Sequence, residues 1–345
     1  MNVLLLLGDF GVPSLVALLA SRHRPVCVVL ATQTTAPPPA TPIDWIRAHA
    51  HPFFWPGTFA PSPRDYRPWT VAATLARNSI PFVEATGLVA SDFFRLIERY
   101  AVDLLLSIGY PRFLPTAVLE KPPGGGVNVH PSLLPRYRGP SPVFWQIALG
   151  EEESGVTLHR MTAEVDAGPI LLQVKTRIVP EETTGALYLR LARLAASLLP
   201  EALTRLETGA LPERQPDFGI GSTQRRFQNE DSLIDWSQPA EDLARLVRAC
   251  SPFPGAQTRL VDGECVRIWR ARAWEGPTRV PSGQIVARRR WSFDVTTGRG
   301  LLRVKTATSN RGHRFPTWGR PWKTLVGGAS LGAGESGQRW GRRQE

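Results

Sequence analysis

Cysteine is scarce in this chain, and so are long hydrophobic runs. The three cysteines, Cys27, Cys250 and Cys265, are odd in number and far apart in the 345-residue sequence, so they match neither a disulfide framework nor the ligand spacing of a metal site. No apolar run approaches the ~20 residues of a membrane-spanning helix. The apolar run Val3–Leu7 is too short for a signal-peptide core, and no Lys or Arg precedes it. These absences predict a cytoplasmic protein with reduced thiols, no metal and no membrane anchor.

Charge is present in ordinary amount but is unevenly distributed. Charged residues make up 21% of the chain and hydrophobic residues 42%, which excludes a wholly disordered or fibrous protein. Residues 1–210 carry a net charge of +1, whereas residues 211–345 carry +10 of the total of +11. Such an excess in one part indicates a polyanionic partner for that part. An arginine-rich surface that only serves solubility explains the excess equally well.

Two kinds of segment alternate over residues 1–207, the expected first domain. Short apolar runs such as residues 3–7 and 102–106 are typical of strands that are buried on both faces of a parallel sheet. Segments with leucines at helical spacing, such as residues 13–21, lie between these runs. Strands separated by helices predict an α/β fold with an open, mostly parallel, Rossmann-like sheet.

Four further segments complete the expected organisation. Residues 32–63 hold eight prolines, five bulky aromatics and one arginine, which predicts an ordered loop inserted in the first domain. Residues 208–230 are polar, with several glycines and prolines, and are interpreted as a linker. Short, evenly spaced apolar runs in residues 231–326 predict a smaller C-terminal β-barrel of the OB type. The glycine-rich residues 327–345 are expected to form a disordered tail.

The side chains with the clearest chemical meaning follow a glycine-rich segment in the first domain. Residues 127–130 are expected to form a strand, in which side chains two apart point the same way, so Asn128 and His130 would face one space. Pro131 and Pro135 end the strand and stiffen the loop behind it. Ligands of open parallel sheets bind beyond the carboxyl ends of the strands, where this loop is expected.

A carboxylate follows farther along the chain, since Asp166 lies among turn residues just before another apolar run. An amide, an imidazole and a carboxylate together suit acyl transfer to an amine. A hydrogen-bond donor stabilises the oxyanion, while protons leave the attacking nitrogen and reach the leaving one. By itself, however, Asn-x-His is more often a hydrogen-bonded pair at a strand end than a catalytic pair. His159, on another expected strand, is interpreted as structural.

The longer run of residues resembles a known family. Asn-x-His, followed by Pro-Ser-Leu-Leu-Pro-x-x-Arg-Gly and then by Asp-x-Gly at 166–168, is similar to the 10-formyltetrahydrofolate-dependent formyltransferases. The resemblance covers most of residues 1–305 and includes Gly-Val-Thr at 155–157. The segments 234–236 and 248–256 indicate members with an appended small barrel. The layout is closest to that of the members that act on methionyl-tRNA.

The resemblance implies a role for each matching residue. Asn128 and His130 would bind the formyl oxygen and stabilise the oxyanion, and Asp166 would orient His130 and assist proton transfer from the amine. The implied co-substrate is 10-formyltetrahydrofolate, without a metal. The residues implied to form the folate pocket are Leu106, Gly109, Tyr110, Ser132, Leu133, Leu134 and Pro135.

The departures from the family pattern concern the acceptor amine. Members that modify tRNA typically carry Gly where this chain has Pro131, and their insertion after the second strand is rich in Arg and Lys. The corresponding residues 32–63 contain Arg47 as their one basic side chain, which is too little to neutralise several phosphates. The arginine run 288–290 in the C-terminal domain could hold a tRNA backbone instead.

Three hypotheses follow for the function. The first is formyl transfer to the α-amine of methionyl-tRNA, with the tRNA held by the basic C-terminal domain. The second keeps the chemistry but has a small amine as acceptor, such as an amino sugar nucleotide or a hydroxylated amino acid. The third is a catalytically inactive, RNA-binding paralogue. The sequence leaves the oligomeric state open.

Overall fold

The computed structural model describes residues 1–31, 68–260, 263–276, 280–309, 314–315 and 331–332. The chain divides into two compact units. The first comprises Met1–Gly139, Glu153–Arg177 and Tyr188–Thr223, and the second comprises Pro140–Glu152, Ile178–Leu187 and Gln224–Glu345. The predicted insertion at 32–63 lies outside the described residues. No helix in the described ranges is long and apolar enough to cross a membrane.

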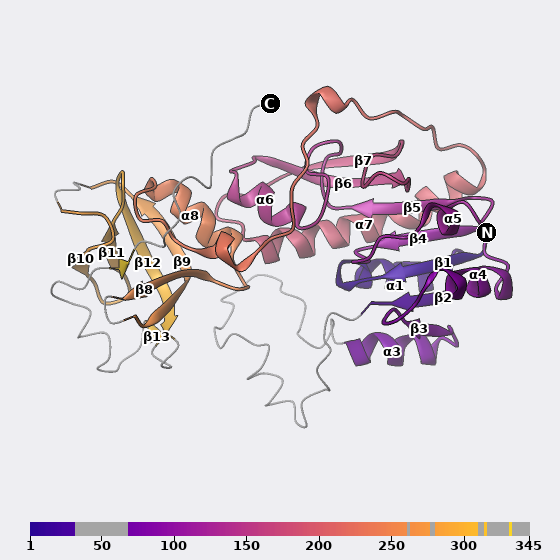
Figure 1. The fold of residues 1–345 in the computed structure, drawn as a ribbon, viewed down its shortest axis with the longest axis horizontal. Coiled ribbons are helices and arrows are strands. Elements are labelled where there is room, and N and C mark those ends of the chain that lie inside the picture. The colour runs from indigo at the N-terminus through magenta and orange to yellow at the C-terminus, as the bar shows by residue number, and fades with distance from the viewer. Residues whose placement is uncertain (32–67, 261–262, 277–279, 310–313, 316–330, 333–345) are drawn as a thin grey trace. The chain divides into compact units, whose positions relative to one another are not determined.

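The first unit is built on a seven-stranded sheet with the order β3-β2-β1-β4-β5-β6-β7 (Figure 1). Neighbours from β3 to β5 run parallel, whereas β6 and β7 are antiparallel additions at one edge. The strands are β1 (Val3–Leu7), β2 (Pro25–Leu30), β3 (Phe82–Glu84), β4 (Leu104–Ile108), β5 (Gly126–His130), β6 (Glu153–Arg160) and β7 (Ile170–Arg177). The predicted open, mostly parallel α/β sheet is confirmed.

Helices follow the parallel strands because each crossover must return the chain to the same end of the sheet. The helices of this unit are η1 (Asp9–Gly11), α1 (Val12–Leu19), α3 (Pro68–Arg77), α4 (Ala90–Arg99), α5 (Thr116–Leu119) and α7 (Thr184–Glu207). Of these, α7 follows the antiparallel strand β7 and belongs to this unit from Tyr188 onward. A further 3-10 turn, η3 (Phe218–Ile220), lies near the end of the unit.

The continuous apolar strands of the sequence form the centre of this sheet. Leu4 and Leu6 of β1 share a buried cluster with Phe93 and Ile97 of α4. Leu5, which points to the opposite face of the sheet, is also 0% exposed. Both faces of a parallel sheet are covered, so its strands are apolar on both faces. Strands in which apolar and polar residues alternate would bury polar side chains in such a sheet.

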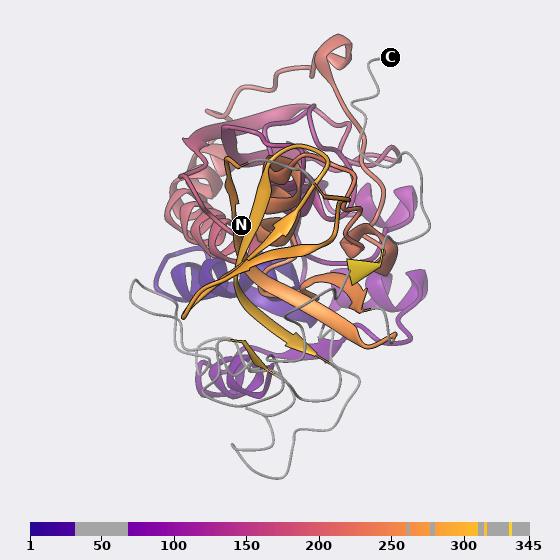
Figure 2. The same cartoon turned by 90° about the vertical axis from the view of Figure 1, so that its left-hand side faces the viewer.

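The second unit contains an antiparallel sheet, whose strands are drawn in orange to yellow in Figure 2. The strand order is β10-β11-β12-β9-β8-β14, and β13 pairs with β12. Its strands are β8 (Ala256–Leu260), β9 (Cys265–Trp274), β10 (Ile285–Arg288), β11 (Phe293–Thr296), β12 (Leu301–Ser309), β13 (Arg314–Phe315) and β14 (Leu331–Gly332). This confirms the predicted C-terminal β domain. Strand β14 falls within residues 327–345, where a tail is expected, and the other residues of that segment lie outside the described ranges.

Two helices and a short 3-10 turn, η4 (Asn229–Ser232), accompany this sheet. Helix α8 (Ala240–Ala249) contacts β9 and β12, and helix α6 (Pro142–Ala148) contacts α8. Acidic residues in the first turn of α8 and Arg248 in its last turn complement the helix dipole. The side chains of Leu243 and Val247, one turn apart, are buried because they face the sheet.

Candidate active site

The end of β5 carries an amide and an imidazole on one face. Asn128 and His130 are two residues apart, so the pleat of the strand turns both side chains the same way. Strand β5 lies between β4, where Ser107 is the partner of Asn128, and β6, where His159 is the partner of Asn128. His130 is only 5% exposed. Its ring is therefore largely shielded from water.

Asp166 contacts several members of the polar cluster at this strand end. Its Oδ2 atom accepts a hydrogen bond from the Gly139 backbone N–H at 2.8 Å and lies 3.5 Å from Nδ1 of His130. Its Oδ1 atom lies 3.4 Å from Nδ2 of Asn128 and 3.4 Å from Nε2 of His159. The backbone of Asp166 has φ +51°, a left-handed conformation that Asp tolerates better than most residues. One carboxylate thus joins groups from two strands and a loop.

The environment holds the Asp166 carboxyl ionised. Burial raises its pKa, but the His130 and His159 rings and the Gly139 N–H together outweigh burial, so the pKa lies well below the ordinary value. For His130 the largest influence is burial, which lowers the pKa, and it prevails over the opposing influence of Asp166 and the Tyr137 carbonyl. The site therefore combines a lasting negative charge with an imidazole that favours its neutral form.

The loop after β5 orients the His130 ring. Nε2 of His130 lies 2.8 Å from the carbonyl oxygen of Tyr137, and it must donate because a carbonyl only accepts. Tyr137 and Gly139 have φ values of +60° and +92°. These left-handed residues reverse the chain, so that the Tyr137 carbonyl and the Gly139 N–H both face the cluster.

A buried polar chain anchors the beginning of the same loop. Oγ1 of Thr157 on β6 donates to the Ser132 carbonyl at 2.7 Å and accepts from the Leu134 N–H at 3.3 Å. Nε2 of Gln173 on β7 donates to that Oγ1 and to the Leu134 carbonyl, both at 2.9 Å. The Ser132 hydroxyl donates to the Arg136 carbonyl at 2.8 Å. The loop is consequently bound to two strands through side chains rather than through the sheet ladder.

The residues that the resemblance assigns to folate lie at two adjacent strand ends. Gly109 and Tyr110 directly follow β4, and Ile108 is the partner of Val129, which places Gly109 beside the end of β5. Gly109 has φ +67°, and a Cβ there would come within 2.7 Å of the Phe10 side chain, so this turn requires glycine. The partly or fully accessible members of the set are Gly109, Tyr110 and Leu133, and the buried ones are Leu106, Ser132, Leu134 and Pro135.

His159 is the residue whose place in the cluster the sequence interpretation missed. It is 2% exposed, and its Nε2 lies 3.1 Å from Nδ2 of Asn128. The partnership depends on the register between β5 and β6, which no local pattern specifies. The available signal was its spacing of two from Thr157, because residues two apart on a strand share a face.

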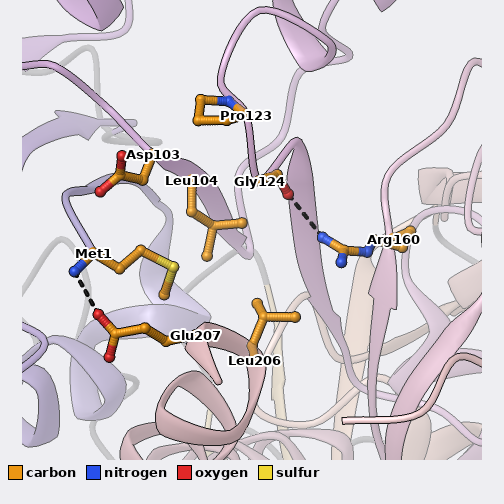
Figure 3. Close-up of a pocket in the computed structure, with 8 residues that line it drawn as sticks. All are labelled: Met1, Asp103, Leu104, Pro123, Gly124, Arg160, Leu206 and Glu207. Atoms are coloured by element: carbon orange, nitrogen blue, oxygen red, sulfur yellow. Dashed lines mark hydrogen bonds and ion pairs between the residues drawn. The ribbon is translucent and has the colours of Figure 1, made fainter. Parts of the chain in front are cut away.

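The amino end of the same sheet holds a cavity of about 410 Å³ (Figure 3). It is lined by Met1, Asp103, Leu104, Pro123, Gly124, Arg160, Leu206 and Glu207. The N-terminal amine pairs with Glu207 at 2.7 Å, Arg160 pairs with Glu213 at 2.7 Å, and the Asp103 carboxylate accepts from the Asn2 N–H at 2.6 Å. None of the residues that the sequence assigns to catalysis or folate lines this cavity.

Two of the three cysteines are held in the protonated form by burial. Burial raises the pKa of the Cys27 thiol to about 11 and also raises the pKa of Cys250, so both stay protonated and poorly nucleophilic. Cys265 is partly exposed, and all three thiols are free. Within the described ranges, no group of three or more His, Cys, Asp or Glu side chains could hold a metal ion.

Comparison with known proteins gives two family matches. The family described as formyl transferase matches residues 62–203, and the formyl transferase C-terminal domain matches residues 226–317. A methionyl-tRNA formyltransferase of Xanthomonas euvesicatoria pv. vesicatoria (strain 85-10) is 36% identical over 298 residues, which cover 86% of this chain and 89% of that protein. One of Syntrophus aciditrophicus (strain SB) is 35% identical over 261 residues, or 72% and 83% of the two chains.

A solved structure resembles the fold at much lower identity. It is that of an N-formyltransferase from Helicobacter canadensis in complex with folinic acid and dTDP-3-aminofucose, with a TM-score of 0.60. The identity is 16%, and the similarity covers 88% of this chain and 99% of that one. The likeness therefore concerns the fold.

Proposed function

Because the chain belongs to the formyl transferase family, we propose that it transfers the formyl group of 10-formyltetrahydrofolate to the α-amine of methionyl-tRNA. Relatives with that name align with most of the chain and with most of their own length. One observation carries the proposal: Asn128, His130 and Asp166 meet at the end of β5, with the Asn128 amide and the His130 ring both within 3.5 Å of the carboxylate. With a tRNA substrate, the proposed site of action is the cytoplasm.

These three groups supply what the reaction needs. The amine nitrogen bonds to the formyl carbon, the bond from that carbon to N10 of the folate breaks, and the proton that the amine loses is balanced by one that N10 gains. An N–H of Asn128 stabilises the negative charge on the formyl oxygen. Nδ1 of His130 faces Asp166 at 3.5 Å, so the carboxylate stabilises the imidazolium that forms when this nitrogen takes up the proton lost by the amine. The positive ring stabilises the oxyanion through its charge until the proton passes to N10.

The neighbouring loops support the assignment of the folate pocket. Gly109 and Tyr110 after β4 flank the same strand end as Leu133 in the loop after β5. Thr157 and Gln173 hold that loop at fixed distances from the sheet. A rigid loop beside the oxyanion donors favours a co-substrate whose reactive carbon is placed by binding rather than by later closure.

The second unit supports a polyanionic acceptor. Three arginines of β9, Arg267, Arg270 and Arg272, are exposed, and Lys305 lies on the adjacent β12. We name these four residues the β9–β12 basic surface. Burial, with the nearby charges of Arg272 and Arg270, lowers the pKa of Lys305 against the opposing influence of Glu181, which pairs with Arg272 at 2.8 Å. Such a surface attracts phosphates without regard to base sequence.

The test combines turnover with a salt titration. Methionyl-tRNA should be formylated, and kcat/KM should fall steeply as salt rises, because phosphate contacts release counterions. Replacing Arg267 and Arg270 by Gln should reduce the slope of log kcat/KM against log salt by roughly 0.7–0.9 per arginine. Arg95→Gln, an exposed arginine of α4, is the matched control and should leave the slope unchanged. Absence of tRNA formylation would contradict the proposal.

A small amine is the second candidate acceptor, and the composition of residues 32–63 favours it. Eight prolines, five bulky aromatics and one arginine suit an apolar or ring-shaped acceptor better than a phosphate backbone. A panel of amino sugar nucleotides and amino acids, assayed beside methionyl-tRNA with the same folate donor, decides between the two. Turnover of a panel member with only a weak salt dependence, and none with tRNA, would establish this candidate.

The inactive RNA-binding paralogue has the least support. Asn128, His130 and Asp166 are all present, and the chain belongs to a family of enzymes. Release of tetrahydrofolate on addition of the acceptor distinguishes the enzyme from a binding protein. Tight RNA binding without any release of tetrahydrofolate would support the inactive paralogue.

A further inference from the structure

We propose that His159 is a positioning residue for formyl transfer: its Nε2 lone pair holds the Asn128 amide in the orientation that presents an N–H to the reacting oxygen. The inference rests on the proposed function, because it concerns the same site. It follows from the contacts of His159 with the Arg160 carbonyl and with Asn128, and from the contact of Asn128 with Asp166. Nε2 of His159 also lies 3.4 Å from Oδ1 of Asp166, so a proton on Nε2 would be bound by that carboxylate and would exclude the proposed arrangement.

The first contact fixes the tautomer of His159. Its Nδ1 atom lies 2.8 Å from the carbonyl oxygen of Arg160. A carbonyl has lone pairs and no proton, so Nδ1 must carry the hydrogen. In the neutral ring the other nitrogen, Nε2, is then an acceptor. The backbone of β6 therefore decides which ring nitrogen is available to the site.

The second contact uses that acceptor. Nδ2 of Asn128 lies 3.1 Å from Nε2 of His159, so one amide N–H of Asn128 donates to the ring. The opposite amide orientation would bring Oδ1 of Asn128 against the Nε2 lone pair and the Asp166 carboxylate, three acceptors without a proton between them. His159 thereby selects between two orientations of Asn128 that have nearly the same shape.

The third contact shows which N–H is available for chemistry. The second N–H of Asn128 faces Oδ1 of Asp166 at 3.4 Å, a longer and weaker contact than the 3.1 Å to His159. The proton on the Asp166 side is the one that a formyl oxygen can take over. The ring retains the other N–H, so the amide does not rotate when the substrate oxygen arrives.

The surroundings of His159 favour this role over simple filling of space. The ring is 2% exposed and lies edge-on to the His130 ring, with centroids 6.4 Å apart and planes at 82°. The titratable groups His130 and Asp166 both lie beside it, and both belong to the proposed reacting cluster. An apolar side chain of similar volume would fill the position but leave an Asn128 N–H without its acceptor.

Two substitutions separate orientation from packing. In His159→Leu the acceptor is lost at similar volume, and we expect kcat to fall by ~10–100-fold, the scale of a misplaced catalytic group, with the dissociation constant for the folate unchanged. In His159→Gln the side-chain oxygen can accept in place of Nε2, and we expect kcat to recover most of that loss. Equal losses in both variants, or no loss in either, would overturn the proposal.

The matched control is His23→Gln, the same change at a buried histidine outside the cluster. His23 is 2% exposed, and its Nε2 lies 2.8 Å from Oγ1 of Thr204. The control should lower stability without altering kcat. A kcat loss as large as that of His159→Leu would mean that the assay reports general destabilisation, and it would overturn the positioning role.

Nitrogen NMR of the unaltered protein tests the inference without a measurement of turnover. The His159 signals, assigned by their loss in His159→Gln, should show a protonated Nδ1 and a bare Nε2 near neutral pH. A proton on Nε2 would overturn the proposal. If no amine is formylated by the unaltered enzyme, the proposed function fails, whereas the NMR result still decides the orientation of Asn128.

Discussion

At the amino end of the seven-stranded sheet the charged groups are paired off, whereas at the carboxyl end several groups share one carboxylate. Glu207 satisfies the N-terminal amine, and Glu213 satisfies Arg160. At the other end, Asp166 serves Asn128, His130, His159 and the Gly139 N–H at once. Pairs of opposite charge have nothing further to offer a ligand. The Asp166 carboxylate has more partners than it can bind tightly, so it can still interact with a ligand.

The cavity and the groups with perturbed pKa values lie at opposite ends of this sheet. The amino end holds the cavity of about 410 Å³, yet its side chains form ordinary pairs at the surface. The carboxyl end holds the perturbed groups, since the pKa of Asp166 is lowered and that of His130 is lowered by burial. Perturbed ionisation marks chemistry more directly than open volume.

Asp166→Asn should give the largest effect. The amide has nearly the same shape but cannot stabilise a protonated His130, so we expect the single-turnover rate of formyl transfer to fall by ~10²–10⁴. Asp103→Asn makes the same change at the amino end, where the carboxylate accepts from a backbone N–H. It should leave the rate near that of the unaltered enzyme. Similar losses in both would remove the distinction between the two ends.

Thr157→Val should act next in size, on binding rather than on the chemical step. The change leaves the Ser132 carbonyl and the Leu134 N–H without their partner, which costs ~1–3 kcal/mol for a buried polar group. We expect a higher KM for the folate, a lower unfolding free energy and a nearly unchanged kcat.

Thr258→Val is the control for this loop experiment. Thr258 is a buried threonine of the second unit, and its hydroxyl accepts from the Trp236 indole N–H at 3.0 Å. The control should be destabilised as well, because it also loses a buried hydrogen bond. Its KM for the folate should not change, and a parallel rise would show that the loop is not specifically involved.

The stability of the carboxyl end should depend on pH. Because the pKa of folded His130 lies below the ordinary 6.5, the unfolded chain binds a proton that the folded chain resists, and stability is lost as pH falls below about 6.5. Urea unfolding of His130→Gln should show a shallower loss over this range. A residual slope from His23 should remain, since burial lowers its pKa too. If the unfolding free energies of His130→Gln and of the unaltered protein fell equally with pH, the loss could not be assigned to His130.

Asp166 should act at still lower pH. Its folded pKa lies below the unfolded value near 3.8, so its contribution is complete above that value and is lost as pH falls beneath it. Asp166→Asn should remove this part of the acid sensitivity. The two windows, below about 6.5 and below about 4, therefore distinguish the imidazole from the carboxylate in one titration.

Glu207→Gln should give the smallest effect. The change removes the pairs with the N-terminal amine and with Arg22, at 2.7 and 3.0 Å, and partly exposed pairs contribute little. We expect the unfolding midpoint to shift slightly and kcat to stay the same. A clear fall in kcat would show that the amino end communicates with the reacting groups.

Much of the geometry of the candidate site could be predicted because its signals are local. Asn128 and His130 share a strand face by period-two spacing, and the proline-rich loop follows them directly in the sequence. The apolar runs of β1 and β4 predict a buried parallel sheet by composition alone. Strands of this kind need no knowledge of their partners to be recognised.

The parts that escaped prediction depend on contacts between distant segments. His159 gains its role from the register of β6 on β5, and Thr157 gains its role from a loop 25 residues earlier. Ser132, assigned to folate by resemblance, is 0% exposed and bonds the Arg136 carbonyl, so its contribution to a pocket stays a prediction. The boundary at residue 207 also stays a prediction, since the compact units divide the chain at several points.

The interleaving of those units has a practical consequence for anyone who would cut the protein in two. Helix α6 is encoded between β5 and β6, yet it belongs to the second unit, where it contacts α8 and where Phe144 meets Phe227 edge-on. A fragment that stops at residue 207 would carry α6 without α8 and expose the apolar side chains that are now 3–6% accessible, Val143, Phe144, Trp145 and Ile147. Exposed apolar surface of this kind promotes aggregation. The two halves of the sequence are thus expected to be produced well only as one polypeptide.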